Sequence, residues 1–160
     1  MAKKNPTSLA SEIQQSRPFS STEEEAYLSL VRTSAELSHR TDQFLKTFGV
    51  TQSQYNVLRI LRGAGPSGLG RNQIAERMVT PTPDASRLLD RLEESGWVKR
   101  NRGSEDRRQV TSCITTPGQK LLKKIDATLI TFHKEQFPGV TKADLRSLLR
   151  ILSHLRTVRQ

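Results

Sequence analysis

Residues 68–118 read GLGRNQIAERMVTPTPDASRLLDRLEESGWVKRNRGSEDRRQVTSCITTPG. In order, their patterns predict a short helix over Gln73–Met78, a turn, a second amphipathic helix that ends near Ser95, and a hairpin rich in arginine. This succession is typical of a winged helix-turn-helix. In that fold the second helix has the size to lie in a DNA major groove, and the hairpin, called the wing, can reach a neighbouring minor groove.

The second helix has one apolar face, because residues at spacing i, i+3, i+4 and i+7 are Ala85, Leu88, Leu89 and Leu92. Its start is predicted at Thr82-Pro83, with Thr82 as the N-cap, since a proline at the first helical position disfavours a helical residue before it. Gly96 favours an end after Ser95. The polar positions near the start are expected to face base edges; they are Thr82, Pro83, Ser86 and Arg87.

The wing is predicted from two short strands, Trp97–Arg100 and Val110–Ile114, around a turn at Asn101–Arg107. Its cations outnumber its acids: Lys99, Arg100, Arg102, Arg107 and Arg108 stand against Glu105 and Asp106. A charge run of this kind can be a solvated hairpin with no partner. Directly after a helix-turn-helix pattern, however, it favours contact with a polyanion, and we expect Arg102, Asp106, Arg107 and Arg108 to lie at the DNA.

The segment ASRLLDRLEESGWVKR, followed by SEDRRQV and ITTPG, resembles the MarR family (multiple antibiotic resistance regulators) of bacterial transcription factors. The wing of that family carries Asp-x-Arg, then a strand, then Leu-Thr-x-x-Gly at the start of the next helix. The matching positions here are Asp106, Arg108, Ile114-Thr115 and Gly118, with Ile in place of Leu. The resemblance implies that Arg108 enters the minor groove and that Asp106 holds it in place.

Composition agrees with an acidic partner. The chain of 160 residues has a formal net charge of +10 and a pI near 10.4, which favours nucleic acid or an anionic membrane surface. No apolar run approaches the ~18 residues of a membrane span, and no signal-peptide pattern is present. We therefore expect no membrane association and a cytoplasmic location. The single cysteine, Cys113, excludes an internal disulfide framework and fits a reducing compartment.

Helical apolar stripes also flank the central motif, and the densest is Leu145–Leu155, after a capping box at Thr141 and Asp144. They could form a core within one chain or bind a second chain. The hydrophobic content of 34% is modest against the usual ~45–50% apolar, a count that includes Gly, and favours the second alternative. The resemblance implies the same, since MarR-like chains interleave their first and last helices with those of a twin. The expected interface residues are Leu30, Leu37, Leu145, Leu148, Leu149, Leu152 and Leu155.

The predicted fold is mainly α-helical with a small β-hairpin wing. Residues 1–20 lack periodicity and are expected to be a disordered arm, and residues 21–160 a single MarR-like domain. Within it, residues 51–116 form the winged helix-turn-helix, whose supporting helix follows a capping box at Thr51 and Gln54. Residues 21–50 and 117–158 form the dimerisation helices.

Catalytic patterns are missing from the sequence. His39, His133 and His154 are scattered, and no HExxH, CxxC, P-loop or GxSxG motif occurs, so we expect neither an enzyme nor a cofactor. A zinc site that uses His39 and His133 is an alternative, but isolated histidines are more often surface or packing residues, and we expect no metal.

Cys113 has two interpretations. It lies on the returning wing strand, on the face opposite Val110 and Ile114, where we expect it to be exposed. Nearby arginines could lower its pKa, so that oxidation would shift the wing and make the protein a redox-sensing regulator. The other interpretation is an incidental thiol.

Together these features predict a homodimeric DNA-binding regulator, a repressor, that holds two recognition helices about 34 Å apart over a pseudo-palindromic operator on double-stranded DNA. The resemblance implies release by a small anionic or phenolic effector, of unknown identity, bound between the dimerisation helices and the winged region. The alternative is a winged-helix module that binds a protein partner, or DNA without operator specificity.

Overall fold

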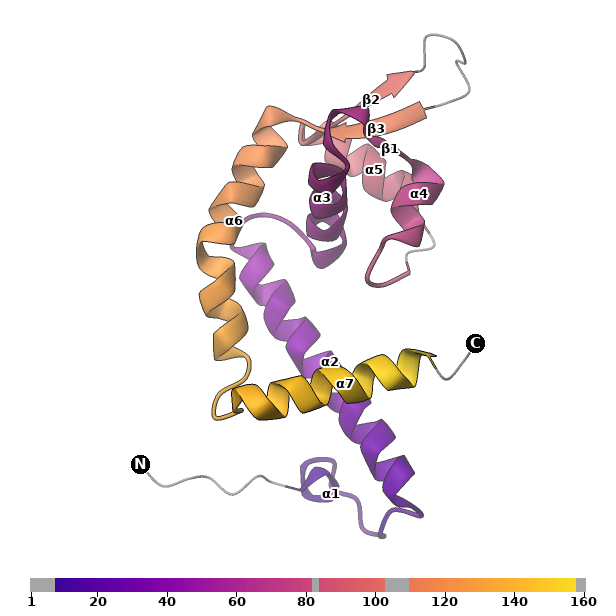
Figure 1. Ribbon diagram of the computed structural model, residues 1–160, viewed down its shortest axis with the longest axis vertical. Helices are drawn as coiled ribbons and strands as arrows, with labels where there is room; N and C mark the ends of the chain where they lie inside the picture. The colour runs from indigo at the N-terminus through magenta and orange to yellow at the C-terminus, as the bar shows by residue number, and fades with distance from the viewer. Residues whose placement is uncertain (1–7, 82–83, 103–109, 158–160) are drawn as a thin grey trace.

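The computed structural model describes residues 8–81, 84–102 and 110–157 (Figure 1). Its elements are α1 (Leu9–Glu12), α2 (Thr22–Lys46), α3 (Gln52–Ala64), the 3-10 turn η1 (Gly65–Ser67), β1 (Leu69–Gly70), α4 (Arg71–Glu76), α5 (Ala85–Glu94), β2 (Val98–Arg102), β3 (Val110–Ile114), α6 (Thr116–Glu135) and α7 (Lys142–Thr157). In Figure 1, α3, α4, α5 and the strands gather at one end, and α6 leads from them to the end where α7 lies. The predicted fold class, mainly helical with a small wing, is confirmed.

The wing belongs to a three-stranded antiparallel sheet of order β1-β3-β2. Strand β2 pairs with β3 from Val98 opposite Ile114 to Arg102 opposite Val110, so the strand extends two residues beyond its predicted end. Strand β1 was not predicted, because two residues are too few to show a periodic pattern. It pairs with the other side of β3, with Leu69 opposite Ser112, and joins the start of α4 to the wing.

The core of the winged region holds the recognition helix α5 in place. Leu89 and Leu92 of α5 are buried against leucines of α3 and α6, Ile74 of α4, and Val98 and Ile114 of the sheet. Leu88 packs partly against the same cluster. The predicted apolar stripe is therefore confirmed, and the opposite side of α5 is left to face outward.

The start of α5 differs from its prediction. Asp84, not Thr82, is the N-cap. It directly precedes Ala85, and its Oδ1 accepts a hydrogen bond from the backbone N–H of Arg87 at 3.2 Å. Thr82 and Pro83 lie outside the described residues. Helix α4 also begins and ends two residues earlier than predicted, since Gln73 Oε1 accepts a hydrogen bond from the N–H of Gly70 and caps the helix there.

The predicted disorder of residues 1–20 does not hold for Leu9–Glu12, which form the one-turn helix α1. Its first turn is capped by Ser8, whose hydroxyl accepts a hydrogen bond from the N–H of Ser11 at 3.4 Å. A cap of this kind leaves no apolar periodicity, and the sequence pattern did not reveal it.

A second apolar cluster joins α2 to α6. Leu45, Val50 and Ile125 are buried in it, and the ring of Phe44 stacks on that of Phe132 with 4.1 Å between centroids. This contact fixes the long helix against the helix that follows the wing. It also brings the dimerisation segments predicted at residues 21–50 and 117–158 together within one chain.

Helix α7 starts at the predicted capping box, in which the N–H of Thr141 donates to Asp144 Oδ2 and the N–H of Asp144 donates to Thr141 Oγ1, both at 3.2 Å. None of its residues is buried. Within the described ranges, no helix is both long and apolar enough to cross a lipid bilayer.

Candidate nucleic-acid interface

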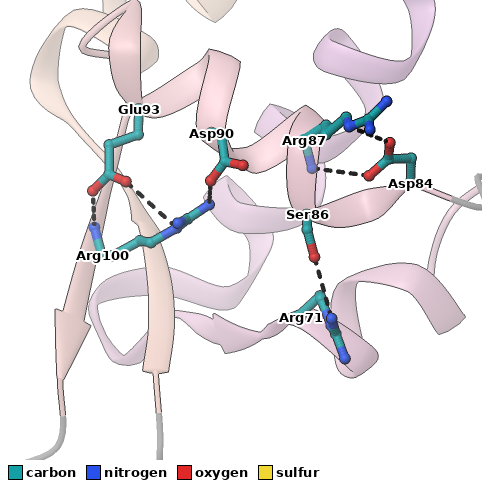
Figure 2. A network of polar contacts seen from close by, with 7 residues as sticks. All are labelled: Arg71, Asp84, Ser86, Arg87, Asp90, Glu93 and Arg100. Atoms are coloured by element: carbon teal, nitrogen blue, oxygen red, sulfur yellow. Dashed lines mark hydrogen bonds and ion pairs between the residues drawn. The ribbon is translucent and has the colours of Figure 1, made fainter.

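Arg87 projects from the first turn of α5, on the side away from the core. Its side chain is 81% exposed, and its Nε lies 3.1 Å from Oδ2 of Asp84 (Figure 2). Asp90, one turn further along α5, pairs with Arg100 and not with Arg87. The predicted outward position of Arg87 therefore agrees with the structure, and Asp84 orients its guanidinium.

Ser86 joins the two helices of the helix-turn-helix. Its hydroxyl accepts a hydrogen bond from Nη1 of Arg71, at the start of α4, with 3.2 Å between the two atoms (Figure 2). Arg71 was not predicted as a site residue, because the contact joins positions 15 residues apart and no local pattern signals it. The hydroxyl of Ser86, which was predicted to face the bases, therefore already accepts a hydrogen bond from Arg71 of the same chain.

A groove of about 700 Å³ lies where α4, α5 and the sheet meet. Its walls come from α4, α5, β2 and β3 and include Arg71, Gln73, Ser86, Asp90, Arg100 and Thr111. The mixture of cations, amides and hydroxyls makes this surface polar where the recognition helix meets the sheet.

Two of the wing cations differ in their surroundings. Lys99 is exposed, whereas Arg100 turns onto α5 and pairs with Asp90 and Glu93, so Arg100 is not one of the free cations that the sequence count suggested. Arg102 ends β2, opposite Val110. Asp106, Arg107 and Arg108 lie outside the described residues.

The predicted exposure of Cys113 is wrong, because its side chain is only 3% exposed. Its thiol donates a hydrogen bond to the carbonyl of Pro66, and Nδ2 of Asn101 donates one to its Sγ, both at 3.4 Å. Turn η1 and strand β1 cover this side of β3, and neither was predicted from the sequence. Oxidants have little access to this thiol, which weakens the redox-sensing alternative.

The residues expected at a subunit interface lie on surface that this single chain leaves open. Leu149 and Leu155 of α7 are 65% and 54% exposed, and Leu30 and Leu148 are also exposed. The remaining three, Leu37, Leu145 and Leu152, are half-buried.

Tyr55 of α3 belongs to the boundary between the winged region and the long helices, since it packs against both apolar clusters. Its hydroxyl oxygen is buried and has no hydrogen-bond partner among the described residues. Burial raises the pKa of this phenol, although the guanidinium of Arg59, 5.8 Å from the ring centroid, opposes the shift.

The histidines show no metal-binding arrangement in the parts of the chain that the structure describes. A ring nitrogen of His39 lies 2.8 Å from Nε2 of Gln43, one turn along α2. No group of three or more His, Cys, Asp or Glu side chains there is placed to hold an ion.

Comparison with known proteins agrees with this geometry. The model of the MarR family matches residues 50–110. A solved MarR transcription factor from Planctomyces limnophilus is 36% identical, with 86% of this chain and 98% of that chain covered and a TM-score of 0.66. The chain belongs to the MarR family.

Other relatives of this MarR-family chain point the same way. An uncharacterized HTH-type transcriptional regulator, YwoH of Bacillus subtilis, is 32% identical over 99 residues, which cover 62% of this chain and 70% of that protein. MepR of S. aureus, solved in complex with DNA, is 25% identical, with 82% of this chain and 97% of that chain covered and a TM-score of 0.73. The protein is thus a MarR-type DNA-binding transcriptional regulator, and the prediction of a regulator in place of an enzyme is confirmed.

Proposed function

We propose that this protein is a homodimeric repressor that binds a pseudo-palindromic operator in cytoplasmic DNA. The observation that carries the proposal is the position of Arg87: it is 81% exposed at the start of a helix whose other face is held in the core by Leu89 and Leu92. The helix thus presents this side chain outward, where it can enter a major groove.

The DNA contacts follow from this placement. Ser86 and Arg87, with Thr82 and Pro83 before them, read base edges in the major groove. Arg102, Arg107 and Arg108 carry the positive charge of the wing, and by family resemblance Arg108 enters the minor groove while Asp106 orients it. The solved complex of MepR with DNA supports such an interface, since the structural alignment with MepR includes 82% of this chain.

The dimer follows from the uncovered apolar surface. Leu148, Leu149, Ile151 and Leu155 of α7 are exposed in the single chain, as are Tyr27, Leu30 and Val31 of α2. Exposed apolar side chains on two long helices favour a second copy, which would bury them and hold the two recognition helices about one DNA turn apart.

Release by an effector is supported by Tyr55. A buried hydroxyl without a partner costs free energy unless another molecule satisfies it. Because Tyr55 lies between the winged region and the long helices, an anionic or phenolic ligand that accepts its hydrogen bond there would change how the two parts pack. We propose that such a ligand lowers DNA affinity.

Selection of bound fragments from a random DNA pool tests the proposal. Enrichment of an inverted repeat supports an operator-specific dimer, and placing that repeat over a promoter in a reporter assay should lower transcription. Without any enriched sequence, the protein would instead be a winged-helix module without operator specificity.

A further inference from the structure

Arg100 joins the wing to the recognition helix. Its guanidinium pairs with Asp90 Oδ1, and its Nε lies 3.4 Å from Oε2 of Glu93 (Figure 2). Its backbone N–H also donates to Oε1 of Glu93 at 3.1 Å. One residue of β2 thus contacts two carboxylates of α5 through three polar links, and we call these three residues the Arg100 cluster.

The strand geometry explains why this arginine turns inward. Side chains alternate along β2, so Arg100 shares a face with Val98, which is only 2% exposed and packs in the core beside α5. Arg100 comes two residues after Val98 and lies further from the core. There its side chain meets Asp90 and Glu93 on the polar side of α5. Lys99 and Asn101 occupy the other face of the strand.

The ion pairs of the Arg100 cluster are too exposed to contribute much to the free energy of unfolding. The side chains of Arg100, Asp90 and Glu93 are 31%, 49% and 41% exposed, and ion pairs this open to solvent contribute little to stability. What the cluster does provide is a set of polar links between β2 and α5. Two of its members, Asp90 and Arg100, also line the groove where α4, α5 and the sheet meet.

We propose that Arg100 is a positioning residue for DNA binding: through Asp90 and Glu93 it sets the orientation of the wing relative to the recognition helix, and it does not contact phosphate. The inference rests on the proposed function, in which the helix and the wing enter adjacent grooves of one operator. A guanidinium suits this role because its planar fork reaches two carboxylates at once, which an ammonium cannot do with the same geometry.

Charge gives the sharpest test, because Asp90 and Glu93 are acids close to a DNA-binding surface. If only charge matters, the double variant Asp90→Asn/Glu93→Gln should bind all DNA more tightly. If the cluster positions the wing, the variant should lose about tenfold in operator affinity, equivalent to about 1.4 kcal/mol, despite its gain in positive charge. Its affinity for unrelated DNA should not fall.

Glu94→Gln is the matched control, since Glu94 is the exposed acid next to Glu93 on the same helix. It should strengthen binding to operator and unrelated DNA alike. Arg100→Lys keeps the charge and should lower operator affinity in the same direction as the double variant, whereas Lys99→Gln should weaken both DNAs equally and lower the salt slope by about one unit.

Titrations of the full-length protein on the selected operator and on an unrelated duplex separate the outcomes, with circular dichroism to confirm folding. A wild-type protein that does not distinguish the two duplexes would contradict the proposed function itself. If the wild type discriminates but the double variant and Arg100→Lys keep the same ratio of affinities, the positioning role is overturned. Arg100→Lys decides alone if the double variant does not fold.

Discussion

At the scale of single residues, charge has different uses at Arg87 and Arg100. Arg87 is 81% exposed and meets one carboxylate, whereas Arg100 is 31% exposed and meets two. The sequence counts both as cations near a DNA-binding helix. Only their surroundings separate them, and they are the basis for proposing that Arg87 reads a base and that Arg100 positions the wing.

Replacing Arg87 with alanine should therefore relax specificity. A bidentate contact to a base is worth about 1–3 kcal/mol, so Arg87→Ala should lose that amount at one operator position and much less on unrelated DNA. Titration against operators mutated one base pair at a time measures the effect. Arg87→Lys, which keeps the charge without the fork, is the control. Equal weakening on every duplex would show that Arg87 contacts only phosphate.

The wing acid Asp106 provides a second residue-scale prediction. Asp106→Ala removes a negative charge from the proposed DNA-binding wing, yet it should weaken operator binding if the carboxylate orients Arg108. Arg108→Ala should also weaken binding and lower the magnitude of the salt slope by up to about one unit. Titrations of both variants at two salt concentrations check this. Tighter binding by Asp106→Ala would rule out the orienting role.

At the scale of elements, the wing depends on a close contact between η1, β1 and β3. Gly68 follows η1 with φ +66° and ψ −168°, a conformation that is essentially restricted to glycine. A Cβ at this position would also meet Cys113 Sγ and the carbonyl oxygen of Ser112. The absence of a side chain at Gly68 therefore allows this segment to lie close against Ser112 and Cys113 of β3.

Gly68→Ala should destabilise the protein by at least about 2 kcal/mol, from backbone strain and steric overlap combined. Gly63→Ala is the matched control: Gly63 lies in α3 with nothing within 4 Å of an added Cβ, so the change should stabilise by about 0.5–1 kcal/mol. Thermal unfolding at one chain concentration compares them. Equal stability of the two variants would contradict the tight contact at β3.

The elements also show what the sequence could predict. The capping boxes at Thr51 and Thr141 were found because all their atoms lie within four residues, and the apolar stripe of α5 because it repeats with the helix. Burial of Cys113 depends on Pro66, 47 residues away, and the Arg100 cluster depends on how β2 crosses α5. Such contacts arise only when distant segments pack, so local patterns could not predict them.

At the scale of the whole molecule, substitution of an exposed leucine of α7 tests whether the protein is a monomer or a dimer. Leu149 is 65% exposed in the single chain, so Leu149→Asp would cost little in a monomer. In the proposed dimer the new carboxylate would be buried without a partner, and sedimentation should show dissociation at micromolar concentration. Arg150→Asp, at an exposed position on the polar side of α7, should leave the dimer intact. Unchanged association of Leu149→Asp would place the interface elsewhere.

The central claim is that two copies of this chain hold their recognition helices at a fixed spacing on one operator. Sedimentation of the protein with the selected duplex, and with a duplex lengthened by about five base pairs between its half-sites, tests it directly, since that insertion turns the half-sites onto opposite faces of the DNA. We predict two chains bound to the original duplex and much weaker binding to the lengthened one. Equal binding to both, or a single chain bound to each half-site independently, would contradict the claim.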